Sequence, residues 1–230
     1  QATKGGIHAY DFLTSWQQAV AAADATVAPP PGLLTGDNLP VLPFYSDDQC
    51  ADEIGPPGSL GATCSALDSG AFCVNVVVPD DPFISKDGST QSRIDAYESA
   101  FGNRTIRICG NASISSASLI LCGHDVANGG DTGDSYINYI LQWTSTSTEV
   151  LVQLAGHLGL SGDPSLNAIA WGPAVGSGQI SGGPYHFKLK DLGGALSSGC
   201  VQTSVASLGS QDNQIKGADI LVPCPECTVD

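Results

Sequence analysis

From Arg104 onward, apolar and polar residues alternate in short runs that glycine-rich stretches separate. Alternation with a period of two, together with many β-branched and aromatic residues, predicts strands that bury one face. We expect strands in the runs RTIRIC (104–109), ASISSASLILC (112–122), SYINYILQW (135–143) and EVLVQLAGHL (149–158). The last two runs flank TSTST (144–148), which predicts a hairpin between them.

The first half of the chain is less regular. Residues 1–6 have no packing pattern and are expected to form a free arm, whereas residues 7–16 favour a strand or extended segment. Thr14 or Ser15 is placed to cap a short helix over residues 17–23. Residues 28–32 (APPPG) end that segment, and residues 33–72 predict a long loop region held by disulfides.

Two further elements are expected before residue 104. The run FCVNVVVPDDP (72–82) predicts a strand that is stopped by Pro79 and Pro82, because proline cannot donate a ladder hydrogen bond. Residues 92–101 (SRIDAYESAF) predict one short helix. The whole pattern predicts an all-β fold: a disulfide-stapled β-sandwich, jelly-roll or immunoglobulin-like, with long loops and one or two short helices.

Length supports one domain over residues 1–230, with 1–16 as an N-terminal arm or strand and 33–72 as a cysteine-containing loop region. Lys and Arg total 8 against 23 Asp and Glu, so the formal net charge is −15. Such a surface repels phosphate backbones and anionic lipids, which disfavours nucleic-acid partners. We expect no membrane insertion, since no apolar run approaches the roughly 18–20 residues that span a bilayer.

The chain holds eight cysteines and no methionine, and it opens with Gln1. We interpret this as a processed, secreted chain whose cysteines are paired in an oxidising compartment. The nearest pairing joins two of Cys50, Cys64 and Cys73. A single CxxC motif without a second one disfavours a zinc site. The expected disulfide cysteines are Cys50, Cys64, Cys73, Cys109, Cys122, Cys200, Cys224 and Cys227.

Two sequons, at Asn103 (Asn-Arg-Thr) and Asn111 (Asn-Ala-Ser), predict N-glycosylation of a secreted chain. Both fall in the strand-rich part of the sequence. An extracellular or cell-surface location is therefore the expectation, with glycans among the partners.

Three histidines lie in strand-like runs: His8, His157 and His186. Three converging histidines would suit zinc or copper, although no paired spacing joins them. The alternative for each of these residues, and for His124, is a partly buried ring that hydrogen-bonds an aspartate or the backbone. Both interpretations stay open at this point.

Three aspartates, Asp125, Asp131 and Asp134, share a glycine-rich loop that offers oxygen ligands to Ca²⁺. No glutamate closes the loop as in an EF-hand, so an acidic turn is the alternative. Asp212 is expected to lock a turn by accepting backbone N–H bonds. Two interpretations are open for Trp16, Trp143 and Trp171: their rings stack on a bound sugar, or they pack in the core.

Motifs of nucleophilic or nucleotide chemistry are missing from the sequence: it has no GxSxG elbow, phosphate loop or dinucleotide fingerprint. We therefore expect no enzymatic activity and no cofactor apart from Ca²⁺.

The blocks HAYDFLT, GHL, WGP, SGGPYHFKL and GSQDNQI form an ordered series along the chain, densest over residues 135–220. The series resembles a group of poorly characterised secreted β-rich modules of large surface proteins, which carry GGHLA, WG.G.G, ISGSPYH and G.QDR in the same order. This chain departs from that pattern with LAGHLGL, with QDNQI, and with a longer cysteine-bearing region over residues 33–125. The resemblance implies an extracellular, non-catalytic surface protein and assigns no functional residue. In such a module, His186 and the polar run QDNQ (211–214), which contains Asp212, are expected to hydrogen-bond buried backbone groups where loops cross.

Three functions follow as hypotheses. The first is an extracellular structural or surface module that self-associates as a glycoprotein filament subunit and donates its N-terminal segment to a neighbour's sheet edge. The alternative is a Ca²⁺-dependent carbohydrate-binding adhesin. The second alternative is a secreted metal-dependent hydrolase or copper enzyme built on the histidines.

Overall fold

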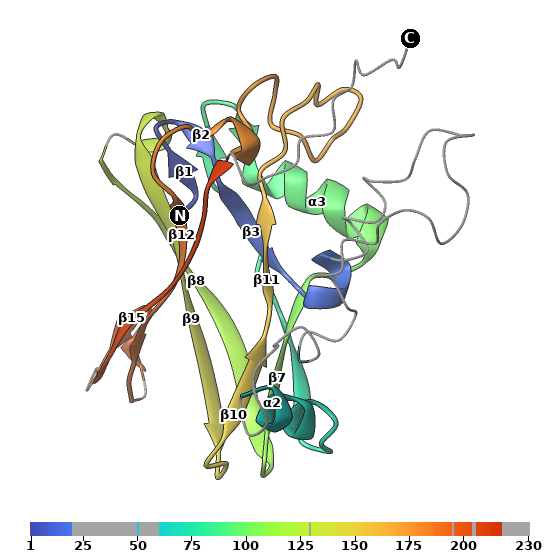
Figure 1. The fold of residues 1–230 in the computed structure, drawn as a ribbon, viewed down its shortest axis with the longest axis vertical. Helices are drawn as coiled ribbons and strands as arrows, with labels where there is room; N and C mark the ends of the chain where they lie inside the picture. The colour runs from blue at the N-terminus through green and yellow to red at the C-terminus, as the bar shows by residue number, and fades with distance from the viewer. Residues whose placement is uncertain (20–49, 51–59, 129, 195, 204–205, 218–230) are drawn as a thin grey trace.

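The prediction of a disulfide-stabilised all-β fold is confirmed. The computed structural model places its strands in two facing layers and a separate ribbon, with helices at the periphery (Figure 1). The structure describes residues 1–19, 50, 60–128, 130–194, 196–203 and 206–217.

The first layer is a long antiparallel hairpin of β8 (Ile114–Asn128) and β9 (Asp134–Ser145), joined through the short 3-10 helix η1 (Gly130–Thr132). At one end, β1 (Thr3–Lys4) and β2 (Ile7–His8) extend the sheet in the order β2-β1-β9-β8. The alternating runs 112–122 and 135–143 therefore lie mainly in the strands β8 and β9, as predicted.

The second layer contains β4 (Cys73–Val77), β7 (Thr105–Gly110) and β10 (Val150–Gln153), in the order β10-β7-β4. Beyond them, β11 (Ala155–Leu158) pairs with β3 (Tyr10–Thr14). The predicted hairpin at TSTST is wrong: β9 pairs with β8 while β10 pairs with β7, so this turn passes from one layer to the other.

The main core lies between these layers. From the second layer, Ile106 and Ile108 are fully buried, and Val76 and Val78 are nearly so. Burial of each such side chain stabilises the fold by about 1.5–3 kcal/mol. The first layer contributes residues that pack against this cluster but stay partly exposed: Ala117, Leu119, Tyr139, Leu141 and Trp143.

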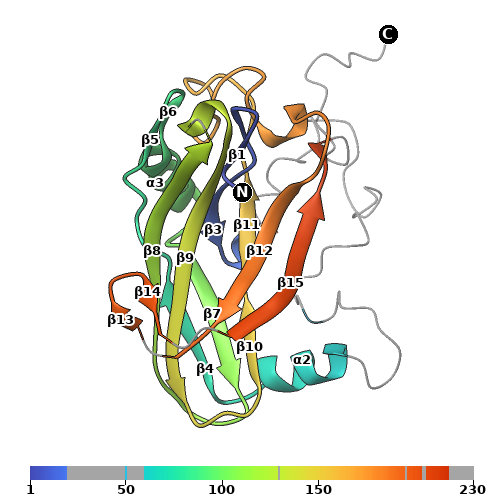
Figure 2. The ribbon, with the colours of Figure 1, turned by 90° about the vertical axis from the view of Figure 1, so that its left-hand side faces the viewer.

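A two-stranded ribbon lies beside the first layer (Figure 2). It consists of β12 (Tyr185–Leu192) and β15 (Ala206–Ile215), with the short strands β13 (Leu196–Ser198) and β14 (Val201–Gln202) in the connection between them. The disulfide Cys122–Cys200 ties this connection to β8.

Two α-helices, α2 and α3, and two 3-10 helices, η1 and η2 (Ser177–Gln179), have bounds within the described residues. The predicted helix 92–101 is confirmed as α3 (Thr90–Phe101), which follows the small hairpin of β5 (Ile84–Ser85) and β6 (Gly88–Ser89). It ends at Gly102, whose φ of 84° is a backbone conformation that glycine adopts without strain. The prediction of a loop over 33–72 missed α2 (Leu60–Asp68).

The predicted helix start near Thr14 and Ser15 is confirmed. Residues 16–19 are helical, and the Ser15 hydroxyl accepts a hydrogen bond of 3.0 Å from the Gln18 N–H, as an N-cap does. The remainder of the predicted helix over 17–23 lies outside the described residues. Among the described residues, no helix is both long and apolar enough to cross a membrane.

The N-terminal segment is not a free arm in this structure. Ala2 and Thr3 are buried, and the Ala2 N–H donates to the Ser135 carbonyl at 2.9 Å. The Ala2 carbonyl in turn accepts a bond of 2.7 Å from the Ala9 N–H. Gln1–Thr14 is thus held by its own chain, because β1 pairs with β9 and β3 pairs with β11.

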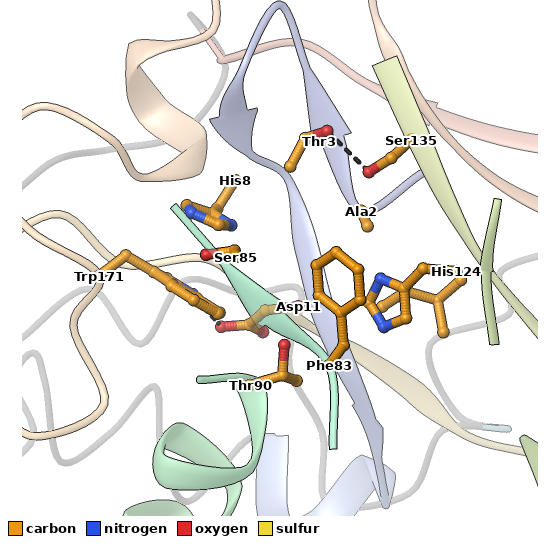
Figure 3. Close-up of a pocket in the computed structure, with 11 residues that line it drawn as sticks. Ala2, Thr3, His8, Asp11, Phe83, Ser85, Thr90, His124, Ser135 and Trp171 are labelled. Carbon is orange, nitrogen blue, oxygen red and sulfur yellow. Dashed lines mark hydrogen bonds between the residues drawn. The ribbon is translucent and has the colours of Figure 1, made fainter. Parts of the chain in front are cut away.

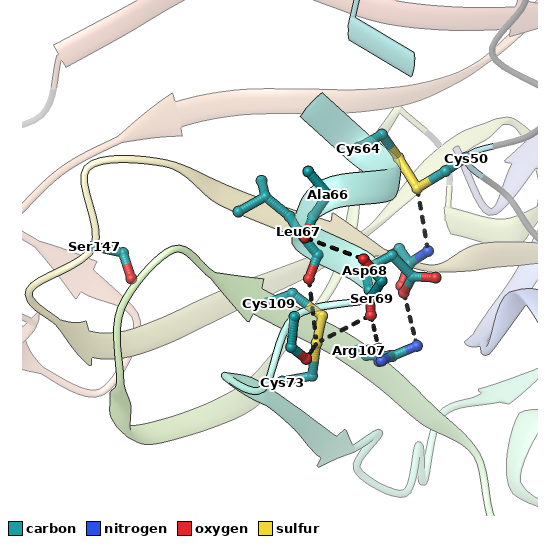
Figure 4. The surroundings of a disulfide bond; sticks show 12 residues. Cys50, Cys64, Ala66, Leu67, Asp68, Ser69, Cys73, Arg107, Cys109 and Ser147 are labelled. Atoms are coloured by element: carbon teal, nitrogen blue, oxygen red, sulfur yellow. Dashed lines mark hydrogen bonds and ion pairs between the residues drawn. A yellow bond between two sulfur atoms is a disulfide. The ribbon is translucent and has the colours of Figure 1, made fainter. Parts of the chain in front are cut away.

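Three disulfides are described: Cys50–Cys64, Cys73–Cys109 and Cys122–Cys200. The first confirms the expected local link, and the second joins directly opposed residues of β4 and β7. Figure 4 shows both beside α2, whose Asp68 forms an ion pair of 2.7 Å with Arg107 of β7. The predicted partners Cys224 and Cys227 lie outside the described residues.

Candidate functional site

Every histidine of the chain contacts an aspartate. This confirms the interpretation of the histidines as rings that hydrogen-bond aspartate; His124, His157 and His186 are partly buried, and His8 is buried. The four nitrogen–oxygen distances lie between 2.7 and 2.9 Å, in the pairs His8–Asp87, His124–Asp81, His157–Asp11 and His186–Asp212.

The pair His157–Asp11, one of two in which the aspartate is almost fully buried, is part of a network around Trp171. Asp11 accepts from His157 Nδ1 at 2.7 Å with one oxygen and from Trp171 Nε1 at 2.9 Å with the other. The Trp171 ring stacks on His8 with the centroids 3.8 Å apart, and the Arg93 guanidinium lies 4.6 Å from the indole centroid. The carboxylate is thereby paired on both oxygens, which offsets the cost of its burial.

The cavity beside this network is too small for a substrate. Figure 3 shows the side chains of His8, Asp11, Phe83, His124 and Trp171 that line it. Its volume is about 10 Å³, which is room for no more than a single water molecule. The network therefore ties together β3, β11 and the loop that carries Trp171.

The Asp11–His157 pair alone resembles two members of a catalytic triad. The His157 ring, however, stacks on Phe12 at 4.4 Å and meets the edge of Tyr97 at 5.2 Å. In the described part of the chain, the hydrogen bond of this ring goes to Asp11, and the aromatic rings of both Phe12 and Tyr97 lie against it.

The three histidines proposed as metal ligands, His8, His157 and His186, do not converge: each contacts its own aspartate. Within the described ranges, no group of three His, Cys, Asp or Glu residues is placed to hold a metal ion.

The acidic loop residues hold neighbouring turns. The Asp131 carboxylate accepts from the Lys86 N–H, and the Asp134 carboxylate accepts from the Gly5 N–H at 2.9 Å. Asp125 lies on β8, at the register position opposite Tyr136. Asp131 and Asp134 thus connect the β8–β9 turn to the turns before β6 and before β2, as the acidic-turn interpretation describes.

The two sequence blocks PYHFKL and SQDNQI face each other as β12 and β15, with His186 opposite Gln214 and Lys188 opposite Asp212. Asp212 accepts from the His186 ring at 2.9 Å and from the Gln214 amide at 3.1 Å. The expectation that Asp212 locks a turn through backbone bonds is wrong, and so is the idea of a loop crossing. Both blocks are strands, and the contacts join side chains across a ladder.

The two sequon asparagines are both exposed. Asn103 lies between α3 and β7. Asn111 follows β7, and its amide nitrogen donates to the Thr148 hydroxyl at 2.9 Å. A glycan on Asn111 would therefore replace that contact.

Two of the tryptophans proposed for sugar stacking pack in the core. Trp171 is 3% exposed, and Trp143 packs against the main cluster. Trp16 is half-buried in the first helical turn.

The feature that sequence reasoning missed is the outer edge of β9. Thr3 of β1 pairs with Ser135 at its start, but between Ile137 and Ser145 the strand pairs with β8 alone among the described residues. At about 3.3 Å per residue, this open edge is roughly 30 Å long. Figure 2 shows it facing the ribbon, without a strand between them.

The apolar side chains along this edge are incompletely covered. Tyr139, Leu141 and Trp143 alternate along β9, face the main cluster and remain partly exposed. On β12, Phe187 packs against the same cluster, whereas Leu189, two residues further on, is 58% exposed. The two layers thus leave apolar surface open on this side.

The ribbon is joined to the first layer near the start of β12 and through the Cys122–Cys200 disulfide. The N-terminal ammonium of Gln1 donates to the His186 carbonyl of β12, while Ala2 donates to Ser135 of β9. Beyond His186, β12 pairs with β15 alone within the described part of the chain. An extended segment would therefore find main-chain donors and acceptors on β9 and a second free edge on β12.

Comparison with known proteins provides no relative: no family model, curated protein or solved structure matches the chain. The function must therefore be argued from the described geometry.

Proposed function

We propose that the chain is an extracellular structural module that associates with further copies of itself by adding a β-strand to the open edge of β9. The observation that carries this proposal is the edge Ile137–Ser145, which lacks a strand partner in the described structure beyond β8. Exposed edges of this kind are templates for pairing with another chain.

The apolar residues beside the edge support association rather than solvent exposure. Tyr139, Leu141 and Trp143 are half-buried core residues, and a strand beside β9 would remove them further from water. Each fully buried side chain of this size contributes about 1.5–3 kcal/mol. Main-chain hydrogen bonds along the edge would add the specificity of register.

An extracellular location is supported by the three described disulfides, since such bonds persist in oxidising compartments. The donor differs from the one first expected. Residues 1–14 already pair within their own domain, so the segment that is donated must come from elsewhere in the chain.

The test is the state of the purified full chain, with its disulfides intact, over a range of concentrations. Light scattering after size-exclusion chromatography and negative-stain electron microscopy should show oligomers or filaments that grow with concentration. A chain that stays monomeric at every concentration contradicts the proposal.

A further inference from the structure

We propose that a groove beside α2 holds the first sugar residues of a glycan that is N-linked to Asn111 of the same chain. The groove lies between α2 and the turn that joins β7 to β8 (residues 111–113), and we call it the α2 groove. The inference rests on the extracellular location in the proposed function, because a secreted chain meets the enzymes that glycosylate sequons. It does not depend on self-association.

The α2 groove is lined mainly by apolar residues. Ala66 and Leu67 of α2 and Phe72, which precedes β4, line it together with Asn111 and Glu149. Figure 4 shows Ala66 and Leu67 beside the disulfide that joins β4 and β7. The volume of the groove is about 470 Å³, which lies within the range of sites that bind small ligands.

Asn111 is exposed at the wall of this groove, and its side-chain amide is fixed in one orientation. Its Oδ1 accepts a hydrogen bond of 3.1 Å from the Thr148 N–H, and its Nδ2 donates to the Thr148 hydroxyl at 2.9 Å. The same Nδ2 lies 3.4 Å from a carboxylate oxygen of Glu149. A sugar that replaces the hydrogen directed at Thr148 therefore starts next to Glu149, at the wall of the groove.

The modification is a group transfer to Asn111 from an oligosaccharide carried on a lipid diphosphate. The bond between Nδ2 and the anomeric carbon forms while the bond between that carbon and the diphosphate oxygen breaks. The lipid diphosphate leaves with the electron pair, and Nδ2 loses one of its two protons. Ser113 supplies the hydroxyl residue that the sequon Asn-Ala-Ser requires.

The lining suits a neutral sugar better than a charged ligand. Phe72 is 44% exposed, and the C–H face of a sugar ring would remove part of this apolar surface from water. The Glu149 carboxylate is an acceptor for sugar hydroxyls, and such charge-assisted hydrogen bonds are strong. The same carboxylate and the net charge of −15 disfavour an anionic occupant.

The second sequon provides a comparison within the same chain. Asn103 is exposed between α3 and β7, and it is not among the residues that line the α2 groove. A glycan on Asn103 should therefore extend into solvent, whereas the glycan on Asn111 should be held against the protein.

The first experiment measures the release of each glycan from the folded chain. A eukaryotic host secretes the full chain as Asn103→Gln, which keeps the Asn111 sequon, and as Ser113→Ala, which keeps the Asn103 sequon. Intact mass establishes occupancy, and a peptide N-glycosidase is then added without denaturant. Release from Asn111 should be about tenfold slower or more, because cleavage requires the sugar to leave the groove first. An unmodified Asn111, or equal rates at the two sites, overturns the inference.

The second experiment fills the groove in the Asn103→Gln chain. Ala66→Gln places a longer side chain at the wall and should raise the release rate at Asn111 toward the rate at Asn103. Ser65→Gln is the matched control, because Ser65 is exposed on α2 and does not line the groove, so release should stay slow. Loss of self-association in Ala66→Gln with unchanged release would place a second copy in the groove and overturn the inference.

Thermal unfolding provides a readout that does not depend on enzyme access. Adding Ser113→Ala to the Asn103→Gln chain removes the glycan and keeps Asn111, so the melting temperature should fall by about 2–4 °C. An unchanged melting temperature contradicts a glycan held in the groove.

Light scattering of the same preparations separates this inference from the proposed function. A chain that stays monomeric and protects the Asn111 glycan contradicts self-association alone. A chain that assembles and releases both glycans equally fast contradicts the α2 groove alone.

Discussion

The hydroxyl groups of Thr3 and Ser135 lie 2.7 Å apart and share a buried hydrogen bond (Figure 3). Thr3 is the residue of β1 that pairs with β9, and beyond Ser135 the outer edge of β9 has no further strand partner in the described structure. The first layer is therefore closed at one end by the N-terminal segment and open along the remainder of β9. This contrast is the basis of the proposed self-association.

The Asp11 network should be a main determinant of stability. Asp11→Ala removes the acceptor of both His157 and Trp171 and leaves two buried donors without partners. We expect a loss of about 3–5 kcal/mol in the free energy of unfolding, measured by urea denaturation. Asp95→Ala, at an exposed position of α3, is the control and should change that free energy by no more than about 0.5 kcal/mol. Equal stability of the Asp11 variant and the parent contradicts the assignment.

Stability should fall as the pH drops below about 6.5. Burial lowers the pKa of His8 below its ordinary value, and this effect outweighs the opposing influence of Asp87 and Asp11. The unfolded chain then takes up a proton that the folded chain resists, so this contribution is complete above about 6.5 and is lost toward lower pH. His8→Phe keeps a ring on Trp171 and should flatten the slope of unfolding free energy between pH 5 and 7. An unchanged slope in that variant would show that His8 is not its source.

Removal of the Cys122–Cys200 disulfide should cost more than removal of Cys50–Cys64. The first closes a loop of 78 residues and the second a loop of 14. Chain-entropy arguments assign about 4.5 kcal/mol to the longer loop and about 3 kcal/mol to the shorter one. Paired Cys→Ala variants, compared by thermal unfolding, should show this order. The reverse order would indicate that local contacts, rather than loop length, dominate.

Leu189 should influence assembly more than folding. It lies on the same face of β12 as Phe187 and is 58% exposed in the single chain. A strand between β9 and β12 would cover it, so Leu189→Lys should weaken assembly while it leaves the unfolding transition in place. Leu166→Lys is the matched control, because Leu166 is 88% exposed in a loop. Light scattering at a series of concentrations distinguishes the two variants, and indistinguishable behaviour would count against the site.

Much of the strand content could be predicted from the sequence because alternation is a local property. The runs that became β7, β8 and β9 show it clearly. Strand pairing is non-local, and for that reason the turn at TSTST was misassigned as a hairpin. α2 was missed because glycines and prolines are scattered through residues 33–72 and indicate a loop. The helix is supported by contacts from elsewhere, such as the ion pair between Arg107 and Asp68.

The candidate site was predictable only in part. The chemistry of histidine indicated aspartate or backbone partners, but the partner of His157 lies 146 residues away in sequence and follows from the fold alone. The open edge of β9 could not be predicted from the alternation of apolar and polar residues, because a strand with one neighbour shows the same alternation as a strand with two.

The most direct test of the central claim is amide hydrogen exchange along β9, resolved to single residues. Ser135 faces β1, so the N–H groups of Ile137, Tyr139, Leu141 and Trp143 point to the same outer edge. The assembled chain should protect these amides strongly relative to the same chain diluted until it is monomeric. The amides of Asn138, Ile140 and Gln142, which face β8, should be similarly protected in both. Unchanged exchange of the outer amides in assembled material would contradict strand addition at β9.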